Sequence, residues 1–293
     1  MKIIRFINEG LSQLAAVDDE GQIFVLLQSD FLALIQEADE KEMSPLELVL
    51  KMIEGREALT CQVDQLELLV PIEAPEVWAA GVTYERSRDA RNYEATEGRL
   101  DALTFYDKVY DAVRPEIFFK STAARTVGPG GEVQLRSDSV WQVPEPELGL
   151  VLNAMGKIVG YTIGNDMSCR DIEGENPLYL PQAKVWKRSC SLGPAIRLAE
   201  TVDDPYNFQI TSRIYRNGEK AVEGTANTNQ LKRKLDELTE FLIRDNELFD
   251  GTVLLTGTCI VPPNEFTLAH GDRIEIEISG IGKLVNHVVG AGS

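Results

Sequence analysis

Short alternations of apolar and polar positions, separated by turn residues, dominate the first thirty residues of the chain. They predict a β-meander of three strands, over residues 1–7, 12–17 and 22–27. Farther on, Ser44 is a capping residue, Pro45 follows at the first helical position, and Glu47 stands three residues after the cap. This combination predicts a helix that runs to about Gly55. The N-terminal part therefore reads as a small β-meander and helix unit.

From about residue 76 onward, the pattern changes to many strands separated by tight turns. Leucines at helical spacing predict one main helix, from Asn229 to about Asn246. Residues 70–75 contain two prolines and read as a linker. We therefore expect an α+β protein with a small N-terminal domain over residues 1–72 and a catalytic domain over residues 73–293.

Three carboxylates are predicted to converge on a β-hairpin in the middle of the chain. Glu145 and Glu147 lie in a Pro-Glu-Pro-Glu segment that favours extended backbone, and side chains two apart on a strand share a face, roughly 6.6 Å apart. The apolar strands 148–152 and 158–163 fold back on each other, which returns Asp166 to the level of the glutamates. Carboxylates without histidine favour Mg²⁺, Mn²⁺ or Ca²⁺ over zinc. The alternative is a solvated acidic strand face.

Composition and charge narrow the classes of function. With 293 residues, 43% of them hydrophobic, the chain can bury a full-size core. A net charge of −18 argues against nucleic acid and anionic membranes as partners. No apolar run reaches the length of a membrane span, and the first residues lack a signal-peptide core, so we expect a cytoplasmic protein. Four well-separated cysteines and only two histidines argue against disulfides, histidine-ligated zinc and a Ser-His-Asp triad.

Other polar residues are candidates for the chemistry around such a cation. Lys184 follows the irregular-looking stretch 170–177; beside a divalent cation its pKa would fall, so that it could act as a base, whereas the alternative is a solvated surface lysine. Glu116 precedes an apolar strand, where an ordinary strand-start carboxylate is the alternative. The turn 256–258 offers hydroxyls and backbone N–H groups to a carboxylate. The charged segment 84–99 predicts a helix whose arginines would reach the site if it closed over it.

From about Glu76 to Val289 the chain resembles the fumarylacetoacetate hydrolase superfamily. The resemblance is carried by Pro-Glu-Pro-Glu-Leu (144–148), Gly-Tyr-Thr-Ile-Gly-Asn-Asp-Met-Ser-Cys-Arg-Asp (160–171), Lys184 followed by Leu-Gly-Pro (192–194), and Leu-Thr-Gly-Thr (255–258). It implies a mixed β-roll core with Mg²⁺ held by Glu145, Glu147 and Asp166. It also implies a small α-keto acid with its keto oxygen on the ion and its carboxylate near Thr258. We expect a homo-oligomer, either a dimer or a tetramer.

One position departs from the hydrolases of this superfamily. They carry an Asn-Tyr-x-x-His motif whose histidine activates water, whereas this chain reads Thr83-Tyr-Glu-Arg-Ser87. The segments 114–122 and 171–184 are similar instead to the 2-keto-3-deoxy-D-arabinonate dehydratase branch. That resemblance implies a Mg²⁺-dependent lyase of pentose degradation, which removes water from a 2-keto-3-deoxypentonate to give 2-oxoglutarate semialdehyde (2,5-dioxopentanoate).

Such a dehydration needs a base at C3 and an acid at the C4 hydroxyl. We assign Lys184 as the base and Glu116 as the acid, with the reverse assignment open. Ser87 and Arg88 are weaker candidates for contacts to the distal hydroxyls. Two alternatives within the superfamily are an acylpyruvate hydrolase, disfavoured by the missing histidine, and an oxaloacetate decarboxylase, which needs only metal and enolate stabilisation. Outside enzymes, the alternative is a binding protein stabilised by a cation.

Overall fold

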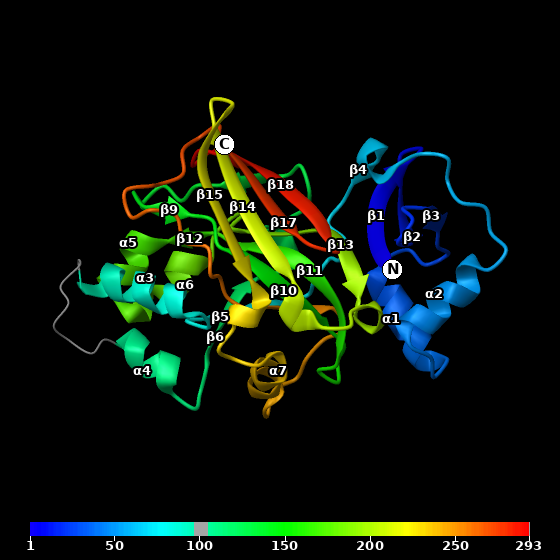
Figure 1. Cartoon of the computed structure of the whole chain (residues 1–293), viewed down its shortest axis with the longest axis horizontal. Helices are drawn as coiled ribbons and strands as arrows, with labels where there is room; N and C mark the ends of the chain where they lie inside the picture. Colours follow the sequence, from blue (N-terminus) through cyan, green and yellow to red (C-terminus); the bar gives the residue numbers. More distant parts are fainter. Residues whose placement is uncertain (97–104, 293) are drawn as a thin grey trace.

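The computed structural model describes residues 1–96 and 105–292 (Figure 1). Its strands are β1 (Lys2–Asn8), β2 (Leu11–Val17), β3 (Ile23–Val25), β4 (Glu67–Leu68), β5 (Val77–Gly81), β6 (Glu116–Ser121), β7 (Thr126–Val127), β8 (Glu132–Gln134), β9 (Gln142–Val143), β10 (Pro146–Leu152), β11 (Ile158–Asp166), β12 (Ser168–Cys169), β13 (Cys190–Leu198), β14 (Gln209–Arg216), β15 (Glu219–Asn227), β16 (Thr252–Leu255), β17 (Arg273–Ile278) and β18 (Gly282–Val289). Its helices are α1 (Phe31–Glu40), α2 (Pro45–Ile53), α3 (Glu85–Thr96), α4 (Phe105–Asp111), α5 (Arg170–Glu175), α6 (Leu180–Lys184) and α7 (Leu235–Ile243).

Two large sheets build the body of the protein. The main path of the eleven-stranded sheet is β3-β2-β1-β13-β11-β10-β16-β5-β6, with β4 beside β1 and β7 beside β13. The five-stranded sheet has the order β15-β14-β17-β18-β8. Most neighbours are antiparallel, but three pairs run parallel: β16 with β5, β18 with β8, and β13 with β7. The protein is therefore of the α+β class, as the sequence predicts.

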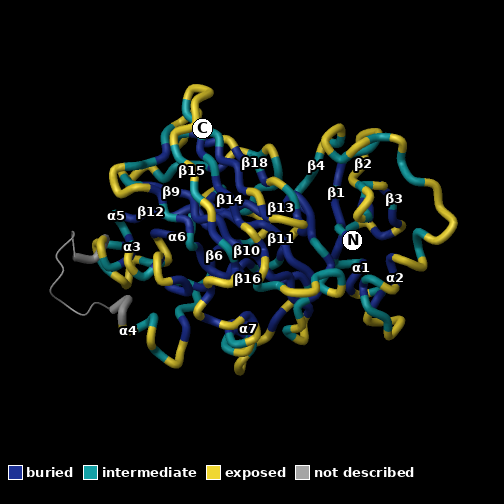
Figure 2. Tube along the Cα trace, in the orientation of Figure 1, coloured by how far each residue is buried: buried dark blue, intermediate teal, exposed yellow. Residues whose placement is uncertain are grey.

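The hydrophobic core lies on both faces of the larger sheet, because side chains alternate between its faces. Leu148, Leu150 and Leu152 of β10 join the cluster that fills the space toward β14, β17 and helix α7. Val151, between them, packs on the other face with α1 and α2. Figure 2 shows the central strands buried, and every residue of β10 is buried.

The N-terminal strands continue the larger sheet. β1 pairs antiparallel with β13, with Ile3 opposite Ile196. Helix α2 begins as the sequence predicts: the Ser44 hydroxyl accepts from the Glu47 N–H and the Glu47 carboxylate accepts from the Ser44 N–H. The division at residue 72 remains a proposal, since the two parts share this sheet and lie side by side in Figure 1.

Two local predictions were wrong. The main helix α7 begins at Leu235, later than expected, because Asn227 caps a 3₁₀ turn over Thr228–Gln230. The stretch 170–177 is not irregular throughout, since residues 170–175 form helix α5. The helix expected over 84–99 is found as α3, and residues 97–99 lie outside the described residues. Among the residues that the structure describes, no helix has the length and apolarity to cross a membrane.

Candidate active site

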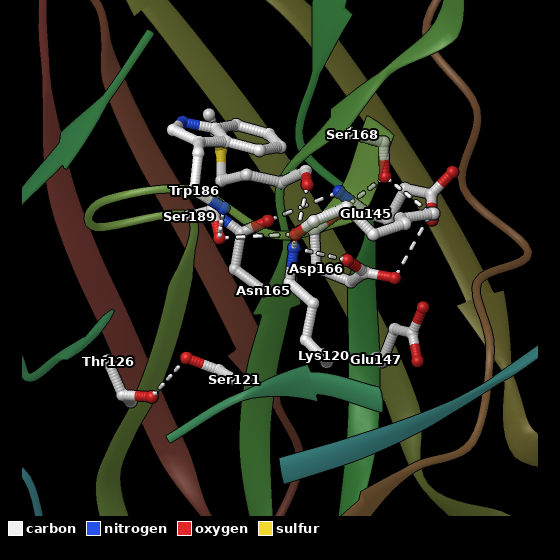
Figure 3. A network of polar contacts seen from close by, with 12 residues as sticks. Lys120, Ser121, Thr126, Glu145, Glu147, Asn165, Asp166, Ser168, Trp186 and Ser189 are labelled. Carbon is white, nitrogen blue, oxygen red and sulfur yellow. Dashed lines mark hydrogen bonds and ion pairs between the residues drawn. The ribbon is translucent and has the colours of Figure 1, made fainter. Parts of the chain in front are cut away.

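The three predicted carboxylates converge at one end of the β10–β11 hairpin (Figure 3). Glu147 lies on β10 opposite Gly164 of β11, and the Asp166 N–H donates to the Glu145 carbonyl at 3.0 Å. This register places one oxygen from each carboxylate within 4.8 Å of the others. All three side chains are buried, so the alternative of a solvated acidic strand face is excluded.

Glu147 is held in position from the turn after β16. Gly257 donates its N–H to Glu147 Oε2 at 2.6 Å. The backbone there has a φ of +93°, and a Cβ on Gly257 would lie 2.0 Å from Thr83 Oγ1 and 2.9 Å from the Ala80 carbonyl oxygen. Thr83 is itself fixed, because its hydroxyl donates to the Thr256 carbonyl at 2.7 Å. Only glycine fits this close approach of two loops behind a carboxylate of the site.

We expect Gly257→Ala to lower the free energy of unfolding by about 2 to 3 kcal/mol, because alanine disfavours positive φ and the Thr83 hydrogen bond would be displaced. Displacing the N–H donor of Glu147 should also weaken Mg²⁺ binding about tenfold or more. Urea unfolding and calorimetric titration with Mg²⁺ would measure the two effects. Gly271→Ala is the matched control, since Gly271 has a φ of +90° but open space around it. Equal losses in both variants would contradict the packing argument.

Lys184 is fully buried and lies against the carboxylates, which excludes the solvated surface lysine. Its Nζ donates to Glu145 Oε2 at 2.6 Å, to Asp166 Oδ2 at 3.1 Å and to Ser168 Oγ at 2.5 Å. Helix α6 ends at Lys184 and so projects this side chain from outside the hairpin. The predicted base and the predicted metal ligands therefore meet in one buried cluster.

Lys120 is a member of this cluster that sequence reasoning missed. Its Nζ lies 2.7 Å from Asp166 Oδ1 and donates to the carbonyls of Met167 and Lys184. It follows an apolar run on β6, so the sequence reads as a strand with a solvated terminal charge. The side chain is instead fully buried, and it ties β6 to the end of β11 (Figure 3).

The electrostatics of the cluster fit a hard divalent cation. Burial and the neighbouring charges of Asp166 and Glu145 raise the pKa of Glu147 well above its usual range. Burial alone would raise the pKa of Glu145, but Lys184 and two arginines outweigh it and lower that pKa to about 2. Burial would likewise lower the pKa of Lys184, yet Asp166, Glu145 and a third carboxylate hold it well above its ordinary value. Carboxylates that oppose each other's ionisation in a buried site would be stabilised by a bound cation.

Glu116 lies at the start of β6, opposite Gly81 of β5. Its carboxylate folds over this glycine, where a Cβ would come within 1.9 Å of Glu116 Oε2. Although the residue as a whole is half-buried, Oε2 is buried without a hydrogen-bond partner among the described residues. Burial raises the pKa of Glu116 above its usual value, Arg91 opposes this, and Glu173 adds to it. A carboxyl whose pKa is raised by burial is better suited to act as an acid.

Glu173 and Arg91 form a second buried ion pair beside Lys184. Glu173 Oε1 lies 3.2 Å from Lys184 Nζ and 3.1 Å from an Arg91 nitrogen. Arg91 belongs to α3, so one arginine of the predicted charged helix does contact the cluster. Glu173 was missed because its direction depends on helix α5, which the sequence did not predict.

The predicted substrate-binding residues lie on two segments: Thr258 on the turn after β16, and Ser87 and Arg88 on helix α3. Thr258 is buried next to Gly257, and its hydroxyl donates to the Ile260 carbonyl at 3.2 Å. Ser87 is buried too, and its hydroxyl donates to the Tyr84 carbonyl at 2.7 Å in the first turn of α3. Arg88 pairs with acidic residues of its own helix. Their contacts with a substrate stay predictions.

The α+β architecture and the buried, metal-compatible carboxylates define an enzyme class, which comparison with known proteins identifies. The family model for the fumarylacetoacetate (FAA) hydrolase C-terminal domain matches residues 87–289, and the chain belongs to this family. This confirms the resemblance inferred from the motifs.

Comparison with individual relatives narrows the similarity from the family to particular dehydratases. The chain is 43% identical to the 2-dehydro-3-deoxy-D-arabinonate dehydratase of Saccharolobus solfataricus, over 98% of this chain and 96% of that protein. It is 50% identical to a probable 2-keto-3-deoxyxylonate dehydratase of Haloferax volcanii, over 75% of this chain and 74% of the relative. A solved 2-keto-3-deoxy-D-arabinonate dehydratase, complexed with magnesium and 2,5-dioxopentanoate, superposes with a TM-score of 0.85 at 39% identity, with full coverage of both chains.

Proposed function

We propose that the protein is a Mg²⁺-dependent hydro-lyase that converts a 2-keto-3-deoxypentonate, 2-dehydro-3-deoxy-D-arabinonate, to 2-oxoglutarate semialdehyde (2,5-dioxopentanoate). The observation that carries the proposal is the buried cluster itself, in which Lys184 and the carboxyl of Glu116 accompany a carboxylate triad. A dehydration needs two proton-transfer groups beside a cation. The names of the two curated relatives and the product bound in the solved neighbour support the same reaction.

Glu145, Glu147 and Asp166 would hold the divalent cation. When bound, this cation supplies Lewis-acid stabilisation of the negative charge that develops as a proton leaves C3. Lys184 is placed to take that proton. Its pKa is held high chiefly by Asp166 and Glu145, so ligation of both by a cation would lower it toward the range in which the amine is a base.

Glu116 would serve the second half of the reaction. Because burial raises its pKa, the Glu116 carboxyl is suited to donate the proton that a departing C4 hydroxyl must take up to leave as water. The C3 proton and the C4 hydroxyl together make up the water lost. A proton then moves from C5 to C3, which shifts the double bond to C4–C5 and leaves an enol at C5. This enol takes up a proton at C4 and loses the proton of its C5 hydroxyl, which gives the C5 aldehyde. The pair of groups can serve these transfers in turn.

Incubation of the purified protein and Mg²⁺ with a panel of 2-keto-3-deoxy sugar acids tests the proposal, with aldehyde formation as the readout. We expect turnover with a 2-keto-3-deoxypentonate and its loss in excess chelator. Rapid pyruvate release from acetylpyruvate would favour the acylpyruvate hydrolase, and loss of carbon dioxide from oxaloacetate the decarboxylase. Stabilisation by Mg²⁺ without turnover of any keto acid would favour the cation-stabilised binding protein.

We expect Glu116→Gln to separate proton exchange from dehydration. The amide cannot donate a proton as a carboxylic acid does, so turnover should fall by about a hundredfold or more. Exchange of the C3 protons with deuterated water should remain measurable, because it needs only the base and the cation. Proton NMR of the substrate in deuterated water would follow both processes in one sample.

The pH dependence supplies the control for this variant. Because the acid form of Glu116 is the active one, wild-type turnover should decline as the pH rises through the raised pKa of Glu116. Exchange at C3 should not decline with it. Equal loss of exchange and turnover in Glu116→Gln would instead assign Glu116 to C3.

The proposal also covers the identity of the metal, the cellular location and the oligomeric state. We propose Mg²⁺ as the resident ion because the solved neighbour contains it, with Mn²⁺ and Ca²⁺ as ions of similar oxygen preference. The four cysteines are free, in keeping with a cytoplasmic protein. A homo-oligomer, either a dimer or a tetramer, remains part of the proposal.

A further inference from the structure

Glu173 has an unusual position for a charged residue outside the carboxylate triad. It lies on the buried side of the short helix α5, which packs against α3, and only 2% of the residue is exposed. One of its oxygens, Oε1, is close to both Lys184 Nζ and Arg91. Both oxygens are buried without a hydrogen-bond partner among the described residues, so the two ion pairs of Oε1 are its polar contacts there. Burial of an ionised group in such surroundings costs free energy unless neighbouring charges of opposite sign compensate for it.

The neighbours of Lys184 show what Glu173 contributes. Lys184 donates its hydrogen bonds to Glu145, Asp166 and Ser168. Two of these acceptors belong to the triad, and carboxylate oxygens that ligate a cation have less electron density for an ammonium group. Glu173 is, among the described residues, the remaining carboxylate in an ion pair with Lys184.

Arg91 gives the second reason. It approaches the same oxygen of Glu173 as Lys184 does, so the carboxylate lies between two buried cations. Without the negative charge of Glu173, Arg91 and Lys184 would repel each other at short range in a site that water does not screen. The Lys184 side chain would then no longer be held in one orientation, although the three carboxylates of the triad would remain in place.

We propose that Glu173 is a positioning residue, which holds Lys184 in its reactive orientation while the triad binds its cation. This inference rests on the proposed function, because Lys184 is the base of that reaction. Glu173 acts through Lys184 and Arg91 and is not itself a metal ligand.

The test compares Glu173→Gln with Glu175→Gln. Glu175 lies on the same helix and is exposed, so this control removes the same charge without touching the cluster. We expect Glu173→Gln to keep its Mg²⁺ Kd within about threefold of wild type, measured by calorimetry. Its kcat should fall about 10- to 100-fold with little change in KM, a range typical of groups that orient a ligand of the site. Exchange at C3 should fall in parallel, and Glu173→Asp should recover part of the loss.

A substrate-free measurement separates this inference from the proposed function. In protein labelled with ¹⁵N-lysine and loaded with Mg²⁺, the Nζ signal of Lys184 is assigned by its absence in Lys184→Met. We expect it to be ordered in wild type and in Glu175→Gln, and broadened or lost in Glu173→Gln. An unchanged signal or an unchanged kcat in Glu173→Gln would overturn the inference. A fall in kcat that is fully explained by weaker Mg²⁺ binding and a lower Tm would also overturn it. If wild type dehydrates no keto acid, the proposed function fails, and the Nζ signal still decides the positioning role.

Discussion

Glu147→Gln is expected to abolish metal-dependent turnover without weakening the fold. The amide keeps an acceptor for the Gly257 N–H but removes the charge that a hard cation needs. Loss of a cation that contributes several kcal/mol to the reaction would lower turnover by about a thousandfold or more. Calorimetric titration with Mg²⁺ and the aldehyde assay would measure the two effects. Normal Mg²⁺ binding by this variant would remove Glu147 from the metal site.

The stability of the same variant gives an independent check. Burial and two neighbouring carboxylates raise the folded-state pKa of Glu147, so in chelator the wild-type protein loses stability as the pH rises from the ordinary glutamate range through that pKa. Glu147→Gln should not lose this contribution, and at neutral pH it should be at least as stable as wild type without metal. Asp166→Ala should behave differently, because it breaks the buried ion pairs with Lys120 and Lys184 and should cost about 3 to 5 kcal/mol.

Lys184→Ala is expected to stop both proton exchange at C3 and dehydration. Lys120 is, among the described residues, the other lysine in an ion pair with the triad, and its amine is engaged by two backbone carbonyls. The turnover of this variant should fall by about a thousandfold or more. This loss is larger than the one expected for Glu173→Gln, in which the base is still present. Proton NMR in deuterated water, with Mg²⁺ at saturation, measures both rates.

Its outcomes distinguish the two assignments of base and acid. Retained exchange with lost turnover would make Glu116 the base at C3 and Lys184 the acid. Lost Mg²⁺ binding would instead mean that Lys184 supports the triad, so Mg²⁺ titration of the variant is the necessary control. Normal turnover would exclude Lys184 from the chemistry altogether.

The carboxylate triad could be predicted because its geometry is local. Alternating prolines hold Glu145 and Glu147 extended, and a short turn returns Asp166 to their level, so nearly all the information lies within one hairpin. The overall α+β class follows in the same way from strand periodicity and the capping box of α2. The family motifs added Lys184 and Glu116, which no local pattern distinguishes from surface charges.

The rest of the cluster depends on packing between distant segments. Lys120 reaches Asp166 only because β6, at the end of the sheet path, comes near the end of β11. Glu173 and Arg91 meet because α3 packs on α5. Charged residues in such segments have the sequence pattern of solvated faces, and their burial is decided by tertiary contacts that a single sequence does not encode in its periodicity.

The pairing of β1 with β13 affects how readily the protein aggregates. β13 carries backbone donors and acceptors along the edge that β1 and β7 cover, and Ile196 there is fully buried opposite Ile3. A chain cut by proteolysis after the N-terminal part would uncover the section of this edge that β1 covers, together with an apolar surface. Exposed strand edges pair with the strands of other chains. By covering this edge, β1 therefore also lowers the tendency of the protein to aggregate.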